Sequence, residues 1–137
     1  PHITLVFPID AEKISEQHLV SHIKQILLSE QGFPFSLKGI MKSWDNFIFL
    51  NVDQGKEEFI TLHDALYSGL LEKFLRKDIE YIPHVTVGRV TAENEKENLL
   101  KAAEENMVFM SKIDSLTLIK RENEMSPVIW EMDFQLK

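Results

Sequence analysis

The chain of 137 residues contains no cysteine. This absence excludes disulfide bonds, zinc sites with thiolate ligands, iron–sulfur clusters and a cysteine nucleophile. Glycine and proline are sparse, with five of each, and no stretch rich in glycine, proline or serine divides the sequence. We therefore expect a single domain over residues 1–137, a length that is sufficient for a hydrophobic core.

Long apolar runs are also missing. None approaches the roughly 20 residues of a membrane-spanning helix, and no signal-peptide pattern opens the sequence, so we expect a cytoplasmic protein without a membrane partner. Positive charge is in deficit, with 15 Lys and Arg against 22 Asp and Glu and a net charge of −7. Long duplex nucleic acid needs a basic surface and is not an expected partner, whereas a small phosphorylated ligand needs only a few local groups.

Hydrophobic patterning predicts a mixture of strands and amphipathic helices. The expected strands are His2–Phe7, Phe35–Lys42, Phe47–Val52, His84–Val90, Ile113–Arg121 and Val128–Leu136. The expected helices are one capped by Asp10 or Ser15, one over Glu57–Phe74 and one opened by Thr91 and Glu93. Strand, helix, strand, turn and strand follow in the same order in residues 1–78 and 79–137. This order predicts two half-units of a duplicated fold, related by a pseudo-twofold axis.

The duplication is clearest where each half-unit begins. Pro1-His2-Ile3-Thr4-Leu5 and Pro83-His84-Val85-Thr86-Val87 share the pattern Pro, His, aliphatic, Thr, aliphatic. On a strand, residues two apart point to the same face, so each histidine projects with its threonine while the aliphatic residues face the core. If the half-units obey twofold symmetry, the two strands can lie side by side, and two imidazoles and two hydroxyls then converge on one cleft.

Such a constellation suits in-line attack at phosphorus. One imidazole takes a proton from the attacking water, and the other gives a proton to the departing oxygen. The threonine hydroxyls would donate hydrogen bonds to the non-bridging phosphate oxygens. We therefore interpret His2 and His84 as catalytic and Thr4 and Thr86 as substrate-binding, with no metal and no cofactor. The near symmetry of the site leaves open which histidine is the acid.

The paired motifs resemble those of the 2H phosphoesterase superfamily, which includes the bacterial 2'-5' RNA ligase-like proteins and the 2',3'-cyclic nucleotide phosphodiesterases. Pro83-His84-Val85-Thr86-Val87-Gly88-Arg89 closely resembles the second motif of the bacterial branch, and the order of elements matches over essentially the whole chain. The resemblance implies an α+β fold of two lobes, each with an antiparallel sheet and outer helices, around a central cleft. Members usually carry a strand and a helix ahead of the first motif, so we expect the sequence as given to lack an N-terminal segment.

The resemblance also implies metal-independent opening of a 2',3'-cyclic phosphate at an RNA or nucleotide end, with His2 as proton donor and His84 as acceptor. One alternative is 2'-5' RNA ligation in the same site. The other is a non-catalytic module that binds a nucleotide or RNA end. The oligomeric state stays open.

Several further side chains allow two interpretations. Strict alternation puts Arg89 with Val85 and Val87, so a surface ion pair is favoured over a phosphate contact. His18 and His22 could share a metal ion, but solvated helix positions are favoured for them and for His63. Candidates for stacking on a nucleobase are Trp44, Phe47 and Trp130, with core packing favoured for the last two, and Met107 and Met110 are expected to fill the core.

Overall fold

The structure is a computed structural model that describes residues 1–43, 45–90, 92, 95, 97, 108–122 and 127–134. The helices are α1 (Glu16–Leu27), α2 (Lys56–Leu66) and the 3₁₀ helix η1 (Gly69–Phe74). The strands are β1 (Phe33–Lys42), β2 (Phe47–Val52), β3 (His84–Arg89), β4 (Val108–Ile113), β5 (Ser115–Ile119) and β6 (Val128–Asp133). No helix among these residues is long and apolar enough to cross a membrane.

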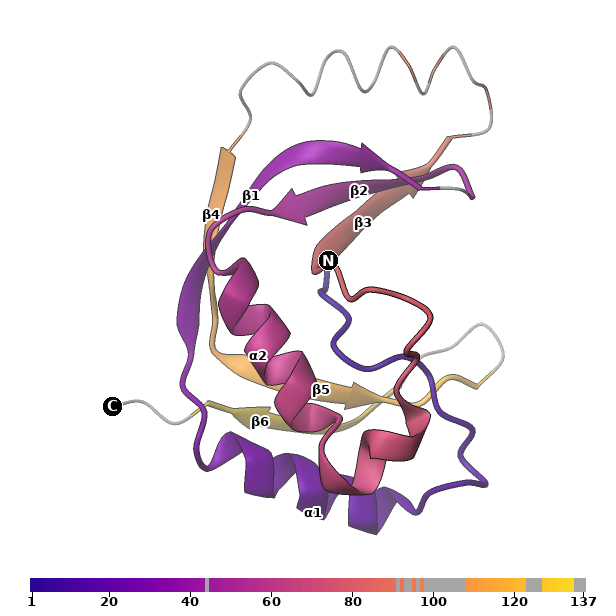
Figure 1. The fold of residues 1–137 in the computed structure, drawn as a ribbon, viewed down its shortest axis with the longest axis vertical. Coiled ribbons are helices and arrows are strands. Elements are labelled where there is room, and N and C mark those ends of the chain that lie inside the picture. Colours follow the sequence, from indigo (N-terminus) through magenta and orange to yellow (C-terminus); the bar gives the residue numbers. More distant parts are fainter. Residues whose placement is uncertain are drawn as a thin grey trace.

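The strands form two antiparallel sheets, which lie at opposite ends of the molecule (Figure 1). The larger sheet has the order β3-β2-β1-β4, and the smaller one pairs β5 with β6. The inner strands of the larger sheet come from residues 1–78 and its outer strands from residues 79–137. Helix α1 lies against the smaller sheet, and α2 lies between α1 and the larger sheet (Figure 1). The predicted α+β fold with antiparallel sheets is therefore confirmed, and it is consistent with two lobes.

Local sequence explains where the helices begin. Ser15 caps α1, because its hydroxyl oxygen accepts a hydrogen bond from the backbone N–H of His18 at 3.1 Å. Gly55 precedes α2 with φ of 85°, a left-handed conformation that glycine adopts without strain. A Cβ atom at this position would lie 2.8 Å from the Cβ of Phe35. The turn from β2 into α2 therefore requires glycine both for its backbone conformation and for space.

The core lies on both sides of α2. On one side, Phe59 meets the rings of Phe33 and Phe35 edge-on, with centroids 4.9 and 5.3 Å away. On the other, α2 joins α1 and the smaller sheet in one cluster, whose buried members are Ile23, Leu27, Leu62, Leu66, Leu116 and Phe134. Because α2 packs against both sheets, it fixes their relative position.

Tertiary pairing changes several predicted elements. The expected strand His2–Phe7 is reduced to one bridge, at Ile3, and the expected helix Glu57–Phe74 is divided into α2 and η1. Gly69, with φ of 59°, stands at the start of η1.

The sequence did not predict β4, in which Met110 is 74% exposed rather than buried in the core. Val128, the first residue of the expected strand Val128–Leu136, is 59% exposed.

Other predictions have mixed outcomes. Trp130 packs partly buried against the core cluster, as predicted. Trp44, Met107 and the helix expected to open at Thr91 and Glu93 lie outside the described residues.

Candidate functional site

The two histidine motifs meet at one backbone bridge. Ile3 pairs antiparallel with Val85. In this register His2 stands opposite Thr86 and Thr4 stands opposite His84. Directly opposite residues have Cβ atoms about 4.5–5.5 Å apart, and diagonal neighbours such as His2 and His84 about 7–8 Å. The structure thus brings the four predicted site residues together.

Burial around the bridge follows the predicted alternation. Val85 is 6% exposed and Ile3 is half-buried, whereas His2, Thr4 and Thr86 are exposed and His84 is half-buried. Residues on either side of a bridge point to the opposite face from the bridged pair. The two histidines and the two threonines therefore share the open face, and the aliphatic residues turn toward the core.

The imidazole of His84 is fixed by two contacts. Its Nδ1 lies 2.8 Å from the carbonyl oxygen of Ile82, and its ring stacks on Phe49 with centroids 3.9 Å apart. Since a carbonyl oxygen can only accept, Nδ1 carries the proton in this contact, and in the neutral ring the lone pair is then on Nε2. The geometry leaves Nε2 as the nitrogen that can accept a proton from a ligand or water.

A β-bulge in β3 changes the position of Arg89. Phe49 pairs with Thr86 and Ile48 with Gly88, so Val87 has no partner on β2, and Arg89 comes opposite Phe47. The guanidinium carbon of Arg89 lies 5.4 Å from the centroid of the Phe47 ring. The prediction that Arg89 faces away from His84 and Thr86 is therefore wrong, because alternation does not continue through a bulge. Phe47 lines the same face instead of filling the core.

Asn51 is a polar residue of this face that the sequence analysis missed. It stands opposite His84 in the pairing of β2 with β3. Among the described residues, its buried Oδ1 has no hydrogen-bond partner. An asparagine at the third position of the alternation Phe47, Phe49, Asn51 could have signalled this placement. Asn51 adds a hydrogen-bond acceptor beside the histidine.

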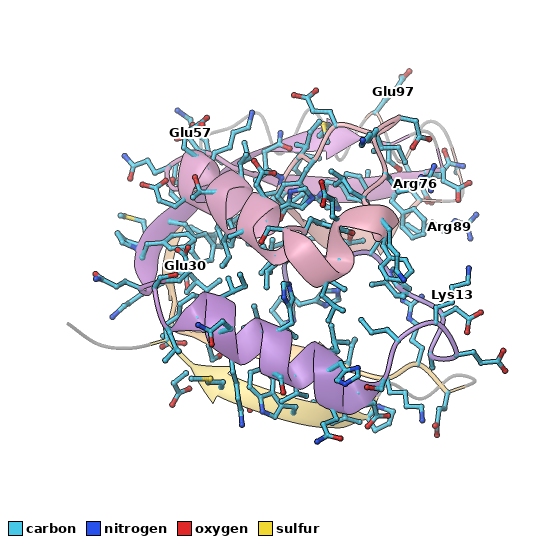
Figure 2. All side chains as sticks on the ribbon, turned by 60° about the horizontal axis from the view of Figure 1, so that its bottom comes forward. Lys13, Glu30, Glu57, Arg76, Arg89 and Glu97 are labelled. Carbon is cyan, nitrogen blue, oxygen red and sulfur yellow. The ribbon has the colours of Figure 1, made fainter. Side chains whose placement is uncertain are left out.

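The basic side chains labelled in Figure 2 lie on one side of the molecule. Lys13, Arg76 and Arg89 project there, with Glu97 above Arg76 in this view, while Glu30 and Glu57 lie on the opposite side (Figure 2). Arg76 is engaged by Asp78, with 2.7 Å between Nη2 and Oδ2. This guanidinium is the main reason that the pKa of Asp78 falls to about 2. Within the described part of the chain, no carboxylate forms an ion pair with Arg89, so its charge is available to a ligand.

The sequence of the chain matches the family model described as the 2'-5' RNA ligase superfamily over residues 1–124. The chain belongs to this superfamily. It is 29% identical over 104 residues to a protein of Bacillus licheniformis, an alignment that covers 73% of this chain and 59% of that protein. It is 28% identical over 91 residues to a protein of Geobacillus thermodenitrificans, covering 65% and 51%. Both relatives carry the name "Putative phosphoesterase", and the matched region spans little more than half of their length.

The remaining histidines of this superfamily member have structural contacts or face solvent. His18 is exposed, as predicted, but the Nε2 of His22 lies 2.8 Å from the carbonyl oxygen of Leu66. His63 is only 5% exposed and stacks on Tyr81, so its predicted place on the helix surface is wrong. No group of three or more His, Asp or Glu suited to a metal ion occurs among the residues described.

Proposed function

We propose that this chain is a metal-independent phosphoesterase, which hydrolyses a 2',3'-cyclic phosphate at an RNA or nucleotide end by two-histidine acid/base catalysis. The observation that carries the proposal is the bridge between Ile3 and Val85, because it makes the two motifs neighbours in antiparallel register. Membership of the superfamily and the names of the relatives support phosphoester chemistry in general. The specific reaction is our inference from the residues at the bridge.

In the proposed reaction, His84 is the base and His2 is the acid. The Nε2 of His84 takes a proton from water as the water oxygen attacks phosphorus, since Nδ1 is occupied by the carbonyl of Ile82. One of the two ring P–O bonds breaks, and His2 gives its proton to the departing ribose oxygen. The product is a phosphomonoester, and the two histidines have exchanged protonation states.

The other groups of the open face stabilise charge in this scheme. Thr4 and Thr86 donate hydrogen bonds to the non-bridging phosphate oxygens, where charge accumulates in the transition state. Arg89, held over Phe47, adds a fixed positive charge on the same face. A few such groups can hold one phosphate on a protein of net charge −7, which favours a nucleotide or an RNA end as substrate over a long duplex.

The first test is hydrolysis of a 2',3'-cyclic nucleotide with excess EDTA. We expect the rate to stay within about twofold of the untreated protein, because no step uses a metal ion. Chromatography of the product should show a single phosphomonoester isomer, since one ring oxygen leaves. Loss of activity in EDTA with recovery on adding zinc or magnesium would refute the metal-independent mechanism.

Ligation is the second candidate, and the family description is the observation that favours it. Two RNA fragments, one ending in a 2',3'-cyclic phosphate and the other beginning with a 5'-hydroxyl, would join if the hydroxyl replaces water as the nucleophile. Joined RNA with a 2'-5' linkage would support ligation. Tight binding of nucleotide monophosphates without turnover of either substrate would indicate a non-catalytic binding module.

The β-bulge places Arg89 on the face of His84, and substitution of Arg89 tests whether it contacts the substrate there. We expect Arg89→Ala to lower kcat/KM by about 10- to 100-fold, because a charge-assisted hydrogen bond is worth roughly 1.5–3 kcal/mol. Arg89→Lys should recover part of this loss, since it keeps the charge but not the forked geometry. Steady-state kinetics on the cyclic nucleotide measure both effects.

Lys112→Ala is the matched control for Arg89. It removes one exposed positive charge from β4, the opposite edge of the same sheet, and should leave kcat/KM unchanged. If the alanine variants at Arg89 and Lys112 behave alike, Arg89 does not contact the phosphate.

A further inference from the structure

The segment that carries the first motif has few backbone contacts with the rest of the fold. Among the described residues, Ile3 makes its one bridge to the larger sheet, and the segment from Pro1 to Ser15 precedes α1 without a strand. His2 and Thr4 lie on either side of this bridge. Besides this bridge, Leu5 and Val6 pack against the core cluster, and side-chain hydrogen bonds hold the backbone of the segment.

Tyr81 provides one of these contacts. Its hydroxyl donates a hydrogen bond to the carbonyl oxygen of Thr4 at 3.0 Å. Its ring stacks on His63, with centroids 4.0 Å apart and planes inclined by 8°. Burial, with a smaller contribution from nearby Tyr67, raises the pKa of Tyr81 far above its usual value, so the hydroxyl keeps its proton and remains a donor.

Tyr67 provides the second contact. Its hydroxyl oxygen accepts a hydrogen bond from the backbone N–H of Phe7 at 3.1 Å. Tyr67 is 3% exposed at the end of α2, and its ring centroid lies 4.9 Å from that of His63. Both tyrosines therefore rest on one buried histidine of α2, and they hold the N-terminal segment at two backbone groups three residues apart.

The same contacts connect the first motif to the second. Tyr81 precedes His84 by three residues, so the segment that leads into β3 also holds the carbonyl of Thr4. Together with the Ile3–Val85 bridge, this gives two attachments between the motifs. Acid/base catalysis by two groups depends on their separation, and a displacement of about 1 Å can lower the rate about a hundredfold.

We infer that Tyr81 and Tyr67 are positioning residues that hold the first histidine–threonine motif at a fixed distance from the second. The kinetic part of this inference rests on the proposed function. The structural part, that the two hydroxyls restrain the backbone of residues 4–7, does not depend on it.

The kinetic test is Tyr81→Phe, which removes the hydroxyl and keeps the ring on His63. We expect kcat on a cyclic nucleotide to fall by about 10- to 100-fold with KM within about twofold, because the substitution displaces His2 rather than removing a binding group. In a background that carries both His2→Ala and Thr4→Ala, Tyr81→Phe should cause no further loss, since it acts through the first motif. An equal loss in both backgrounds would overturn the inference.

Ser36→Ala is the matched control for the loss of a buried hydroxyl. The hydroxyl oxygen of Ser36, in β1, accepts a hydrogen bond at 3.0 Å from the backbone N–H of Gln54, which lies in the turn between β2 and α2. This variant should lower the thermal midpoint without changing kcat on the folded protein. A fall in kcat equal to that of Tyr81→Phe would mean that the tyrosine acts only through stability, which would overturn the inference.

Hydrogen exchange tests the structural part without any assay of activity. In Tyr67→Phe the amide of Phe7 loses its acceptor, and we expect its exchange to quicken about three- to tenfold, while the amide of Gln54 is unchanged. If the wild-type protein hydrolyses no cyclic phosphate, the proposed function fails and this measurement still decides whether the tyrosine restrains the segment. An unchanged rate at Phe7 would overturn the restraint.

Discussion

Replacement of His84 by alanine is expected to lower kcat for hydrolysis of a 2',3'-cyclic phosphate by about 10²- to 10⁴-fold. The substitution removes the proposed base and leaves the side chains of His2, Thr4 and Thr86 in the chain. His2→Ala should lower kcat by a similar factor, because it removes the proposed acid. Single-turnover rates on a cyclic nucleotide, measured with each variant, test both expectations.

The pH dependence of kcat distinguishes the two roles. A base must be unprotonated and an acid protonated, so the wild-type rate should rise and then fall with increasing pH. His84→Ala should abolish the rise at acidic pH, and His2→Ala should abolish the fall at alkaline pH. If instead His84→Ala abolishes the fall at alkaline pH and His2→Ala abolishes the rise at acidic pH, the two histidines have exchanged roles.

His18→Ala serves as the control for these substitutions, because His18 is an exposed histidine of α1. It should change neither kcat nor the pH profile. If His84→Ala retains more than about a tenth of wild-type kcat, His84 is not the base, and the proposed mechanism is refuted.

The largest expected effect on stability comes from Phe59→Ala. Phe59 is 1% exposed and packs edge-on against Phe33 and Phe35, so it joins α2 to β1. Truncation of a buried phenylalanine costs about 3–5 kcal/mol, which is a large part of the roughly 5–15 kcal/mol that stabilises a typical domain. Urea unfolding at equilibrium should show a lower midpoint with an unchanged slope.

Two further variants serve as controls for Phe59→Ala, one at an exposed position and one with a conservative substitution at Phe59. Met110→Ala, at a side chain that is 74% exposed, should change the free energy of unfolding by less than about 0.5 kcal/mol. Phe59→Leu keeps an apolar side chain at the position and should cost less than alanine. A loss below about 1 kcal/mol for Phe59→Ala would show that α2 is not held to the larger sheet by this ring.

Hydrophobic patterning predicted a mixture of strands and helices, and the repeated motif predicted that the two motifs meet. The α+β class came from the resemblance to the 2H phosphoesterase superfamily. The repeated pentapeptide marks two segments with the same polar face, and the Ile3–Val85 bridge joins them, although only the second segment forms a strand. The sequence offered Asp10 or Ser15 as the cap of the first helix, and the structure has Ser15 in this place. The cap depends on residues close together in sequence, and the meeting of the motifs was predicted because one local pattern occurs in two distant segments.

Features that depend on partners distant in sequence were not predictable in this way. The bulge at Val87 is defined by pairing with β2, and it alone moves Arg89 to the face of His84. His63 is covered in part by the ring of Tyr81, which comes from a different segment. β4 is an edge strand with Met110 and Val108 exposed, so it lacks the apolar alternation of a buried strand.

The contact between Ile3 and Val85 also has a consequence for folding. The two residues are separated by roughly 80 residues of chain, and closing a loop of this length costs about 4 kcal/mol of chain entropy. The backbone hydrogen bonds that one bridge can make, worth about 1 kcal/mol each, do not offset this cost. The ends must already be held near each other by the core around α2 before the bridge can form. We therefore expect the two motifs to come together late in folding, after the core around α2 has formed.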